Sequence, residues 1–434
     1  MKRVALHTLG CKLNFAETST IGRQFSDRGY TVVPFDQQAD VYVLNTCSVT
    51  ERAESDCRYL VRRVLRQAPT ACVILTGCYA QLRPGELAGI DGVDAVLGTS
   101  EKFRLFDHLA SFEKKETPEI FVSCIDDAPA ADPAYSAEVG GRTRAFLKVQ
   151  DGCDYSCSFC TIPRARGESR SVPPADLLLT ARRLAGEGFR EIVLTGVNVG
   201  DYGRKNGGSL LALLAELDRV DGIERIRISS VEPNLLTRPL IDWILGSAKF
   251  CHHFHVPLQS GSGGVLTRMR RRYRPDLYAG LVSYIAASDP DAAIGADVIS
   301  GFPGETEGEF SDTARFIADL PLSYLHVFTY SGRPGTAAAG MPAQVEPRVR
   351  FKRSAILRNI GRMKRRTFHE RFRGATVPVL FEQEIGSGLH SGVTQNYIRV
   401  EVASSRIRPN DIVPVTITEC GEDDCHGVPA PQVK

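Results

Sequence analysis

Short apolar runs alternate with stretches of helical periodicity at the start of the chain. Three of the apolar runs, at 4–11, 41–47 and 73–78, end in cysteine. Apolar runs that alternate with helical patterns are typical of a parallel α/β sheet. We therefore expect a small N-terminal domain of this kind over residues 1–112.

Six further strand-like runs follow, and a helical pattern comes after each of them. The runs lie at 146–149, 192–195, 226–229, 254–256, 294–299 and 324–330. Polar and glycine-rich residues stand directly after the runs, where (β/α) barrels carry their chemistry. Thr306 and Glu309 have capping-box spacing, which predicts that a helix begins after the fifth run. The pattern predicts a partial (β/α)6 TIM-like barrel over residues 142–370.

Two segments differ from this alternation. Residues 113–141 are rich in Pro, Ala, Ser and acidic side chains without clear periodicity, which is typical of a linker between domains. Residues 371–434 contain alternating runs, such as 397–402 and 413–417, separated by turn residues. This pattern predicts a small C-terminal β-barrel, so the expected fold class is α/β with three parts.

The composition is that of an ordinary globular protein. The chain has 434 residues, of which 43% are hydrophobic and 24% charged. A chain of this length suggests roughly two to four domains. No apolar run is long enough to span a bilayer, and the start of the chain turns polar too soon for a signal peptide. We expect a cytoplasmic protein without a membrane partner.

The net charge of +2 hides a strong local bias. Basic residues crowd positions 348–373, where only Glu370 opposes them, and a second basic group lies at 268–274. Such clusters indicate an anionic partner. A solvated helix face is the alternative interpretation of the first group.

Three cysteines, Cys153, Cys157 and Cys160, lie together with three and then two residues between them. Thiols at this spacing suit three corners of a cubane iron–sulfur cluster and leave the fourth iron without a thiolate. Clusters used only for electron transfer normally have four cysteine ligands, whereas an open iron can bind a small molecule, so the spacing favours catalysis. A zinc knuckle is the alternative, but no fourth ligand follows at finger-like spacing.

The cysteines that end the N-terminal runs, Cys11, Cys47 and Cys78, predict a second site. The carboxyl ends of parallel strands share one edge of a sheet, where ligands usually bind, so cysteines far apart in sequence can meet there. We expect a second three-thiolate metal site. Buried cysteine also acts as a small hydrophobe, which is our interpretation of Cys57 and Cys72.

These motifs resemble those of the methylthiotransferase family of radical S-adenosylmethionine (SAM) enzymes. The cysteines between 153 and 160 are similar to the CxxxCxxC signature of radical SAM enzymes. The family also has motifs that bind an auxiliary cluster, and this chain resembles them at residues 8–14, 45–47 and 76–78.

The resemblance extends over nearly the whole chain and is strongest to the MtaB-type branch of the family. The chain resembles that branch at residues 146–153 and 165–171. It resembles a TRAM module at residues 392–397. The resemblance implies an N-terminal methylthiotransferase domain, a central radical SAM domain and a C-terminal TRAM domain.

The family resemblance implies SAM and two 4Fe-4S clusters as cofactors. The cluster at Cys153, Cys157 and Cys160 would be catalytic and bind SAM, and the one at Cys11, Cys47 and Cys78 would be auxiliary and carry sulfur. The resemblance also places SAM contacts along the barrel rim. The residues concerned are Phe159 near the adenine, Thr195, Gly196 and Asn198 near the amino group, Ser229, Ser230 and Glu232 near the ribose, and Gln259.

The activity implied by the resemblance is tRNA modification. Enzymes of this branch convert N6-threonylcarbamoyladenosine beside the anticodon to its 2-methylthio derivative. SAM would serve twice, as methyl donor to a sulfur and as source of a 5′-deoxyadenosyl radical that abstracts hydrogen from the base. The expected partners are a tRNA anticodon stem-loop, a low-potential electron donor and a sulfur source.

Other functions fit part of the same pattern. A sibling enzyme acts on isopentenyladenosine in tRNA, and another acts on an aspartate of a ribosomal protein; the basic group at 348–373 favours RNA. A noncatalytic iron–sulfur RNA-binding protein would make no 5′-deoxyadenosine. A zinc protein would be colourless, whereas two cubanes would give a brown solution with about eight irons.

Overall fold

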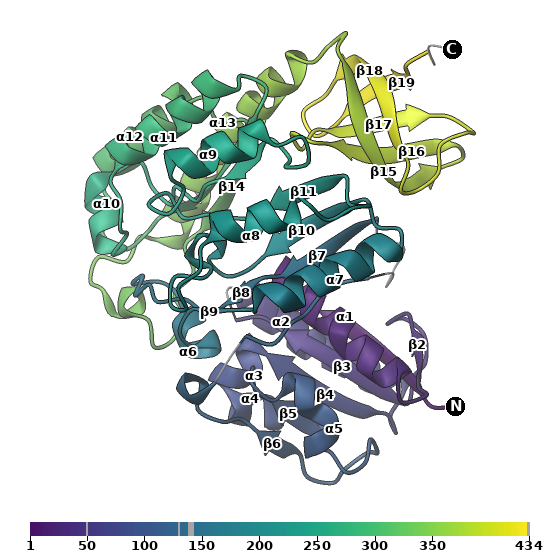
Figure 1. Ribbon diagram of the computed structural model, residues 1–434. Helices are drawn as coiled ribbons and strands as arrows, with labels where there is room; N and C mark the ends of the chain where they lie inside the picture. Colours follow the sequence, from purple (N-terminus) through teal and green to yellow (C-terminus); the bar gives the residue numbers. More distant parts are fainter. Residues whose placement is uncertain (49–50, 129–130, 138–142, 432–434) are drawn as a thin grey trace.

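The computed structural model describes residues 1–48, 51–128, 131–137 and 143–431. Three units follow one another along the chain: a sheet covered by helices, a half-open barrel of strands and helices, and a small β-barrel (Figure 1). Parts of the predicted linker, 129–130 and 138–141, lie outside the described residues, as does 142, where the predicted barrel domain begins.

The N-terminal unit is built on an all-parallel sheet of six strands in the order β2-β1-β3-β4-β5-β6. The strands are β1 (Arg3–Thr8), β2 (Thr31–Val33), β3 (Val41–Thr46), β4 (Cys72–Gly77), β5 (Ala95–Leu97) and β6 (Glu119–Phe121). The prediction of a parallel α/β sheet is confirmed. The last strand, β6, lies inside the segment expected to be a linker, so part of that segment belongs to the sheet.

Helices cover both faces of this sheet. They are α1 (Lys12–Ser26), α2 (Glu51–Gln67), α3 (Cys78–Leu82), α4 (Pro84–Ala88) and α5 (Leu105–His108). Successive side chains of β3 point to opposite faces: Tyr42 and Leu44 enter one hydrophobic cluster, while Val41 and Val43 enter the other. A strand that is buried on both sides is therefore apolar throughout, as the sequence shows.

The central unit contains the six predicted strands, which confirms the partial barrel. They form two parallel three-stranded sheets, with the strands β7 (Arg144–Lys148), β10 (Glu191–Thr195), β11 (Arg225–Ile228), β12 (His253–His255), β13 (Ala293–Ser300) and β14 (Tyr324–Thr329). The two sheets meet where Cys251 N donates to Ile226 O at 2.9 Å. A short pair, β8 (Gln150–Asp151) and β9 (Arg170–Ser171), flanks the cysteine loop.

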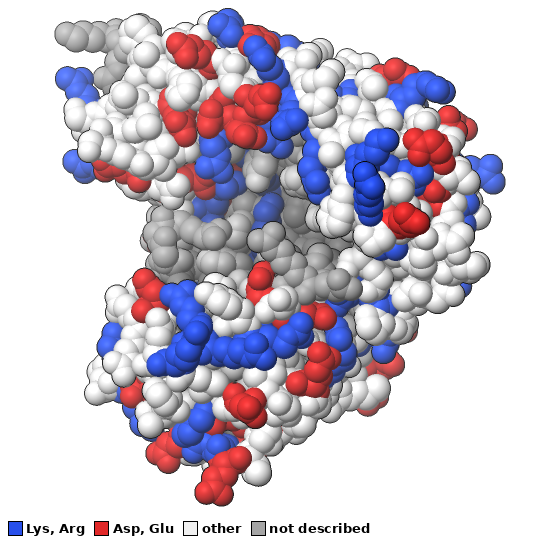
Figure 2. Space-filling model, turned by 180° about the vertical axis from the view of Figure 1, so that it is seen from behind, with Lys and Arg blue, Asp and Glu red and all other residues white. Residues whose placement is uncertain are grey.

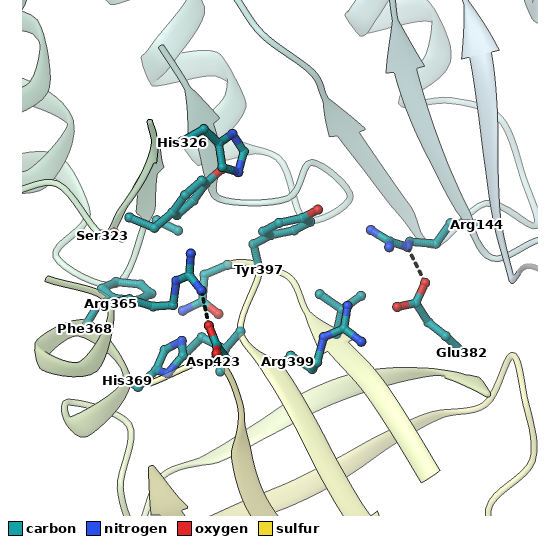
Figure 3. Close-up of a pocket in the computed structure, with 15 residues that line it drawn as sticks. Arg144, Ser323, His326, Arg365, Phe368, His369, Glu382, Tyr397, Arg399 and Asp423 are labelled. Carbon is teal, nitrogen blue, oxygen red and sulfur yellow. Dashed lines mark hydrogen bonds and ion pairs between the residues drawn. The ribbon is translucent and has the colours of Figure 1, made fainter. Parts of the chain in front are cut away.

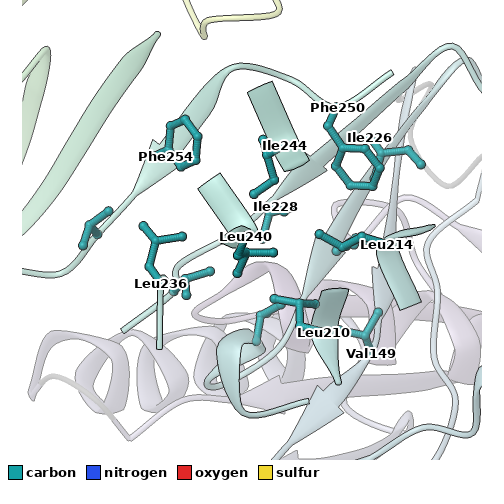
Figure 4. Close-up of a cluster of buried hydrophobic side chains, with 14 of the residues drawn as sticks. Val149, Leu210, Leu214, Ile226, Ile228, Leu236, Leu240, Ile244, Phe250 and Phe254 are labelled. Atoms are coloured by element: carbon teal, nitrogen blue, oxygen red, sulfur yellow. The ribbon is translucent and has the colours of Figure 1, made fainter. Parts of the chain in front are cut away.

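Helices accompany the strands of the barrel. They are α7 (Pro174–Gly186), α8 (Leu210–Leu217), α9 (Arg238–Gly246), α10 (Gly263–Arg268), α11 (Pro275–Ser288) and α12 (Glu307–Asp319), while α6 (Ile162–Arg166) follows the cysteine loop and packs against α3 of the N-terminal unit. The predicted capping box of α12 is present, with Thr306 and Glu309 bonded reciprocally. Figure 4 shows Leu214 of α8 and Ile244 of α9 packed with Ile226 of β11 in the core between strands and helices.

The C-terminal unit is a closed barrel with the strand order β15-β16-β17-β19-β18. The strands are β15 (Thr376–Gly386), β16 (Leu389–Thr394), β17 (Arg399–Ala403), β18 (Ile412–Cys420) and β19 (Cys425–Pro429). Two buried arginines of β11 hold it against the central unit: Arg225 donates to Val393 O at 3.0 Å and Arg227 donates to Gln395 O at 2.8 Å. The small β-barrel is confirmed, and its identity as a TRAM domain remains a prediction.

The basic group at 348–373 lies largely on α13 (Pro347–Glu370), the helix that leads into the C-terminal barrel. Several of its side chains are used within the protein: Arg353 pairs with Glu305 at 2.8 Å, and Lys364 donates to the Leu320 carbonyl at 2.6 Å. Arg348, Lys352, Arg358 and Arg366 are exposed. Some of these basic side chains therefore make contacts within the protein, and the others add positive charge to its surface. Among the described helices, none is both long and apolar enough to cross a membrane.

Candidate active site between two cysteine trios

Cys11, Cys47 and Cys78 come together because they follow three adjacent parallel strands. In the sheet, Thr8 of β1 is paired with Asn45 of β3, and Thr46 of β3 with Gly77 of β4. The three strands therefore end at the same level of one edge. We call Cys11, Cys47 and Cys78 the N-terminal trio.

The turns before two of these cysteines require glycine. Gly10 and Gly77 have φ angles of 104° and 97°, which L side chains rarely adopt. A Cβ on Gly10 would lie 2.8 Å from Cys47 Sγ, so the turn that places Cys11 is packed directly against Cys47. After the turn, Cys11 takes the N-cap position of α1 without a side-chain capping bond, and burial raises the pKa of its thiol, an effect that Arg166 opposes.

Asn14 and Arg166 hold this edge together. The Asn14 side-chain amide donates to Leu9 O at 2.9 Å and to Thr46 O at 3.1 Å, which joins the ends of β1 and β3. Arg166 of the central unit donates to Asn14 Oδ1 at 2.6 Å, and its Nε lies 3.2 Å from Cys78 Sγ. A side chain of the barrel therefore reaches a cysteine of the N-terminal trio.

Cys153, Cys157 and Cys160, the barrel trio, lie on the loop after β8. The loop is fixed by Cys153 N, which donates to Gly167 O at 3.0 Å. Arg271 Nη1 lies 3.2 Å from Cys157 Sγ. Burial raises the pKa of Cys153 to about 11 and that of Cys160 to about 12. Thiolates at these positions therefore need positive charge close by, which metal ligation supplies.

The geometry of both trios suits a cluster better than a single zinc ion. Among the described residues, neither trio has all three sulfurs within 4.8 Å of one another. Tetrahedral zinc binds sulfur at about 2.3 Å, which places its sulfur ligands roughly 3.8 Å apart. A cubane distributes its thiolates over different irons, and three thiols per site match a cluster with one open iron.

The two trios lie on either side of one interface. Ser48, next to Cys47, and Thr161, next to Cys160, line the same recess of about 150 Å³. Figure 2 shows the molecule from behind as hollowed between the N-terminal unit and the units above it, with Lys and Arg side chains along the hollow. Groups bound at the two trios would thus share one region.

A buried charge network joins the two units at this interface. Arg166 pairs with Glu17 and Asp151, each at 2.9 Å, and Glu17 also pairs with Lys102 at 2.7 Å and Lys148 at 3.1 Å. Burial alone would raise the pKa of Glu17 and of Asp151, but Arg166 and its neighbouring lysines hold both below their ordinary values. Three cations face two carboxylates, and a Cys78 thiolate would balance the remaining charge.

The expected SAM contacts follow the barrel strands, and they differ in whether their side-chain polar atoms already have hydrogen-bond partners. Asn198 is buried, and among the described residues neither polar atom of its side chain has a hydrogen-bond partner. The Ser229 hydroxyl is likewise without one. Buried polar atoms need partners, so both are available to a ligand. Thr195 is committed instead to Leu147 O at 3.2 Å.

The other expected contacts surround the same rim. Glu232 forms an ion pair with Arg271, so it reaches the barrel trio through that arginine. Phe159 packs near Phe302, with ring centroids 6.4 Å apart. Gly196 directly follows β10, Ser230 is the second residue after β11, and Gln259 lies in the loop after β12 with a left-handed φ of 64°.

A cluster of three side chains inside the barrel was not anticipated. His255 Nε2 and His326 Nδ1 lie 2.9 Å and 3.2 Å from Asp297 Oδ1. The sequence indicated no partners for His255, because Asp297 and His326 come from later strands. Burial alone would raise the pKa of Asp297, but hydrogen bonds from the two histidines lower it.

Tyr397 of the C-terminal unit reaches the open end of the barrel. Figure 3 shows it between His326 and Arg144, at a recess of about 180 Å³. Its ring lies 5.0 Å from the Arg227 guanidinium and 6.0 Å from the Lys12 ammonium. Burial alone would raise the pKa of Tyr397, but Lys12, Arg144 and Arg227 lower it. Sequence adjacency to Cys11 was the one signal that could have singled out Lys12.

Family models match two parts of the chain. An uncharacterized protein family, UPF0004, matches residues 3–98, which carry the N-terminal trio. The Radical SAM superfamily matches residues 147–317, which carry the barrel trio.

Curated relatives match nearly the whole chain. It is 39% identical to the threonylcarbamoyladenosine tRNA methylthiotransferase MtaB of Bacillus subtilis (strain 168), over 97% of this chain and 95% of that protein. The MtaB of Aquifex aeolicus (strain VF5) is 37% identical over 92% of this chain and 96% of its own length. A tRNA-2-methylthio-N(6)-dimethylallyladenosine synthase of Frankia alni is 37% identical over 79% of this chain and 69% of its own.

Solved structures agree with the fold. The radical SAM methyltransferase TsrM from Kitasatospora setae, with tryptophan substrate and a SAM analogue bound, superposes with a TM-score of 0.56 at 14% identity. The match covers 89% of this chain and 79% of that one. At that identity the likeness shows the fold alone. The full-length sequence matches show more: this chain belongs to the MtaB-type family of radical SAM methylthiotransferases.

Proposed function

We propose that this enzyme converts N6-threonylcarbamoyladenosine beside the tRNA anticodon to its 2-methylthio derivative. The observation that carries the proposal is the meeting of two three-cysteine sites at one interface, joined by Arg166. One site serves radical formation and the other sulfur insertion, and a methylthiotransferase needs both next to its substrate. The substrate is inferred from the names of relatives that match more than nine-tenths of the chain.

As a radical SAM enzyme, the protein uses SAM and an iron–sulfur cluster. We assign one 4Fe-4S cluster to the barrel trio and a second to the N-terminal trio. A cluster with an open iron supplies SAM activation at the first site and holds sulfur at the second. In this assignment Arg271 and Arg166 each donate to one cysteine and offset thiolate charge.

Residues of the barrel rim would bind SAM. The unpartnered side chains of Asn198 and Ser229 are the best supported contacts. Phe159 would lie near the adenine of SAM, and Gly196 would let the backbone approach its amino group. Ser230 and Gln259 would lie further along the rim. Glu232 would act through Arg271, as a positioning residue for Cys157.

The interface between the units suits a base that has left its stack. Unpaired RNA bases are recognised when they are extruded into a protein recess, and excluding water protects a radical from side reactions. Basic side chains along the hollow would bind phosphates, so affinity for tRNA should fall as salt rises. We place the reaction in the cytoplasm and infer a low-potential electron donor and a sulfur source as further partners.

The domain assignment is part of the proposal. Residues 1–112 would form the auxiliary-cluster domain, 142–370 the radical SAM domain and 371–434 the TRAM domain, joined by 113–141. The exposed basic residues of α13, such as Lys352 and Arg358, would extend the phosphate contacts between the last two domains.

Nucleoside mass spectrometry of tRNA from cells with and without this protein tests the proposal. We expect 2-methylthio-N6-threonylcarbamoyladenosine to disappear and its precursor to accumulate. Loss of a 2-methylthio derivative of a dimethylallyl-type adenosine instead would support the alternative suggested by the Frankia relative. Unchanged tRNA in both strains would contradict both assignments.

A further inference from the structure

Lys12 is the basic side chain closest in sequence to the N-terminal trio, because it directly follows Cys11. It begins α1, and its side chain is exposed. Within the described residues no carboxylate lies at ion-pair distance from it. The other cations of this interface are committed: Arg166 to Glu17 and Asp151, and Lys102 and Lys148 to Glu17.

The surroundings of Lys12 are electropositive. Arg144 and Arg227 lie around the same Tyr397 ring, at 5.9 Å and 5.0 Å from its centroid. Their charges are already paired, since Arg227 binds Glu191 at 2.9 Å and Arg144 binds Glu382 at 2.8 Å. Lys12 thus adds a positive charge without an ion-pair partner, because the carboxylates nearby, Glu191 and Glu382, already pair with Arg227 and Arg144. An anionic ligand is the chemistry that such a site recognises.

Tyr397, whose ring lies 6.0 Å from the Lys12 ammonium, lines the recess of about 180 Å³ and is held in one conformation. Its backbone has a left-handed φ of 67°, which is strained for a bulky side chain. The strain is held by packing: the ring stacks on His253 with centroids 4.6 Å apart, and Tyr397 N donates to Thr394 O at 3.2 Å. The ring therefore presents a preorganised aromatic surface next to the Lys12 ammonium.

The proposed substrate has an anion at a suitable distance. Its threonyl carboxylate lies roughly 8 Å from C2 of the adenine by standard bond lengths. If C2 faces the sulfur site at Cys11, that carboxylate falls within reach of the residue that follows Cys11. A dimethylallyl group at the same nitrogen is uncharged and would leave the ammonium unpaired.

We propose that Lys12 binds the threonyl carboxylate of the substrate and so selects it over adenosines with an uncharged N6 group. This inference rests on the proposed function, and it adds the residue that determines substrate choice within it. Tyr397 acts as a positioning residue, because its ring lies 6.0 Å from the Lys12 ammonium.

Binding of three anticodon stem-loops to anaerobically reconstituted protein tests the inference. The first carries N6-threonylcarbamoyladenosine, the second its threonyl methyl ester and the third unmodified adenosine. We expect wild-type protein to prefer the first over the second by about 10-fold to 100-fold, the range of a charge-assisted contact. Lys12→Met should lose that preference, and Lys12→Arg should keep most of it.

Lys352→Met provides the matched control. Lys352 is exposed on α13, so this change should alter affinity for all three stem-loops by the same factor if it contacts phosphate. Iron content of each variant is measured first, because Lys12 is adjacent to Cys11. Wild-type protein that binds acid and ester equally would overturn the inference without any variant.

The outcomes separate this inference from the proposed function. If wild type methylthiolates the first stem-loop and Lys12→Met retains the acid-over-ester preference, the proposed function stands and the role of Lys12 is wrong. If wild type neither prefers nor modifies the first stem-loop, the proposed function itself fails.

Discussion

Replacing Arg166 by methionine should weaken the attachment of the N-terminal unit more than any exposed arginine change. Arg166 is 1% exposed and donates to Glu17, Asp151, Asn14 and the Cys78 sulfur. Methionine keeps much of the aliphatic volume but leaves these acceptors without their donor. Removing one partner of a buried ion pair typically costs about 3–5 kcal/mol.

Urea unfolding under anaerobic conditions measures this effect. The single tryptophan, Trp243, packs on Phe250 in the central unit and reports its unfolding by fluorescence. With a urea slope of about 3–4 kcal/mol per molar, a loss of this size lowers the midpoint by about 1 M. Arg164→Met is the control, because Arg164 is exposed on the same helix and its side chain, among the described residues, donates only to Pro334 O, at 3.3 Å.

The balance of buried charges leads to a second expectation for Arg166→Met. With Cys78 as a thiolate, the three cations balance Glu17, Asp151 and the sulfur; without Arg166 the buried group carries one excess negative charge. The variant should therefore lose more stability in the reconstituted form than in the cluster-free form. Equal midpoint shifts for Arg164→Met and Arg166→Met would refute the argument from buried charge.

Gly10→Ala should disturb the N-terminal trio alone, because a Cβ there would meet Cys47 Sγ at 2.8 Å, and iron analysis should show loss of about four irons. Gly29→Ala, with a similar φ of 81° and nothing within 4 Å, is its control and should keep all iron. Cys153→Ala should abolish 5′-deoxyadenosine formation from SAM, while Cys47→Ala should retain some of it and make no methylthio product; full product from Cys47→Ala would contradict the auxiliary site. Because the folded-state pKa of Asp297 is lowered by its two histidines, its contribution to stability is present above about pH 4 and is lost as pH falls below that value. Asp297→Asn should flatten this acid-side slope in unfolding titrations, and an unchanged slope would assign it to other carboxylates.

The sequence pattern was sufficient where local chemistry fixes structure. Apolar runs that end in cysteine predicted where β1 and β4 end, and the structure shows that the chain leaves the sheet there through left-handed turns at Gly10 and Gly77. The six barrel strands and the capping box at Thr306 were likewise readable from periodicity. The six cysteines remain a prediction as cluster ligands, although strand order brings the N-terminal trio to one edge of the sheet and a single loop carries the barrel trio.

The sequence alone could not predict which charged side chains pair with one another. Arg164 and Arg166 are two residues apart in the sequence, and only packing decided that Arg166 is buried against Cys78 while Arg164 is exposed. The His255 and Asp297 pair was hidden for the same reason, since its members lie on different strands.

The sequence by itself determined three units, their strand and helix order and the two groups of cysteines, because periodicity and turn residues act over a few neighbours. The tertiary structure decided which cations are neutralised and which stay free, because that depends on contacts between segments remote along the chain. Lys12 and Tyr397 come from opposite ends of the sequence and meet only when the C-terminal barrel packs against the central unit. Electrostatic selectivity arises at that meeting, in a partly desolvated recess where one unpaired charge has a large effect.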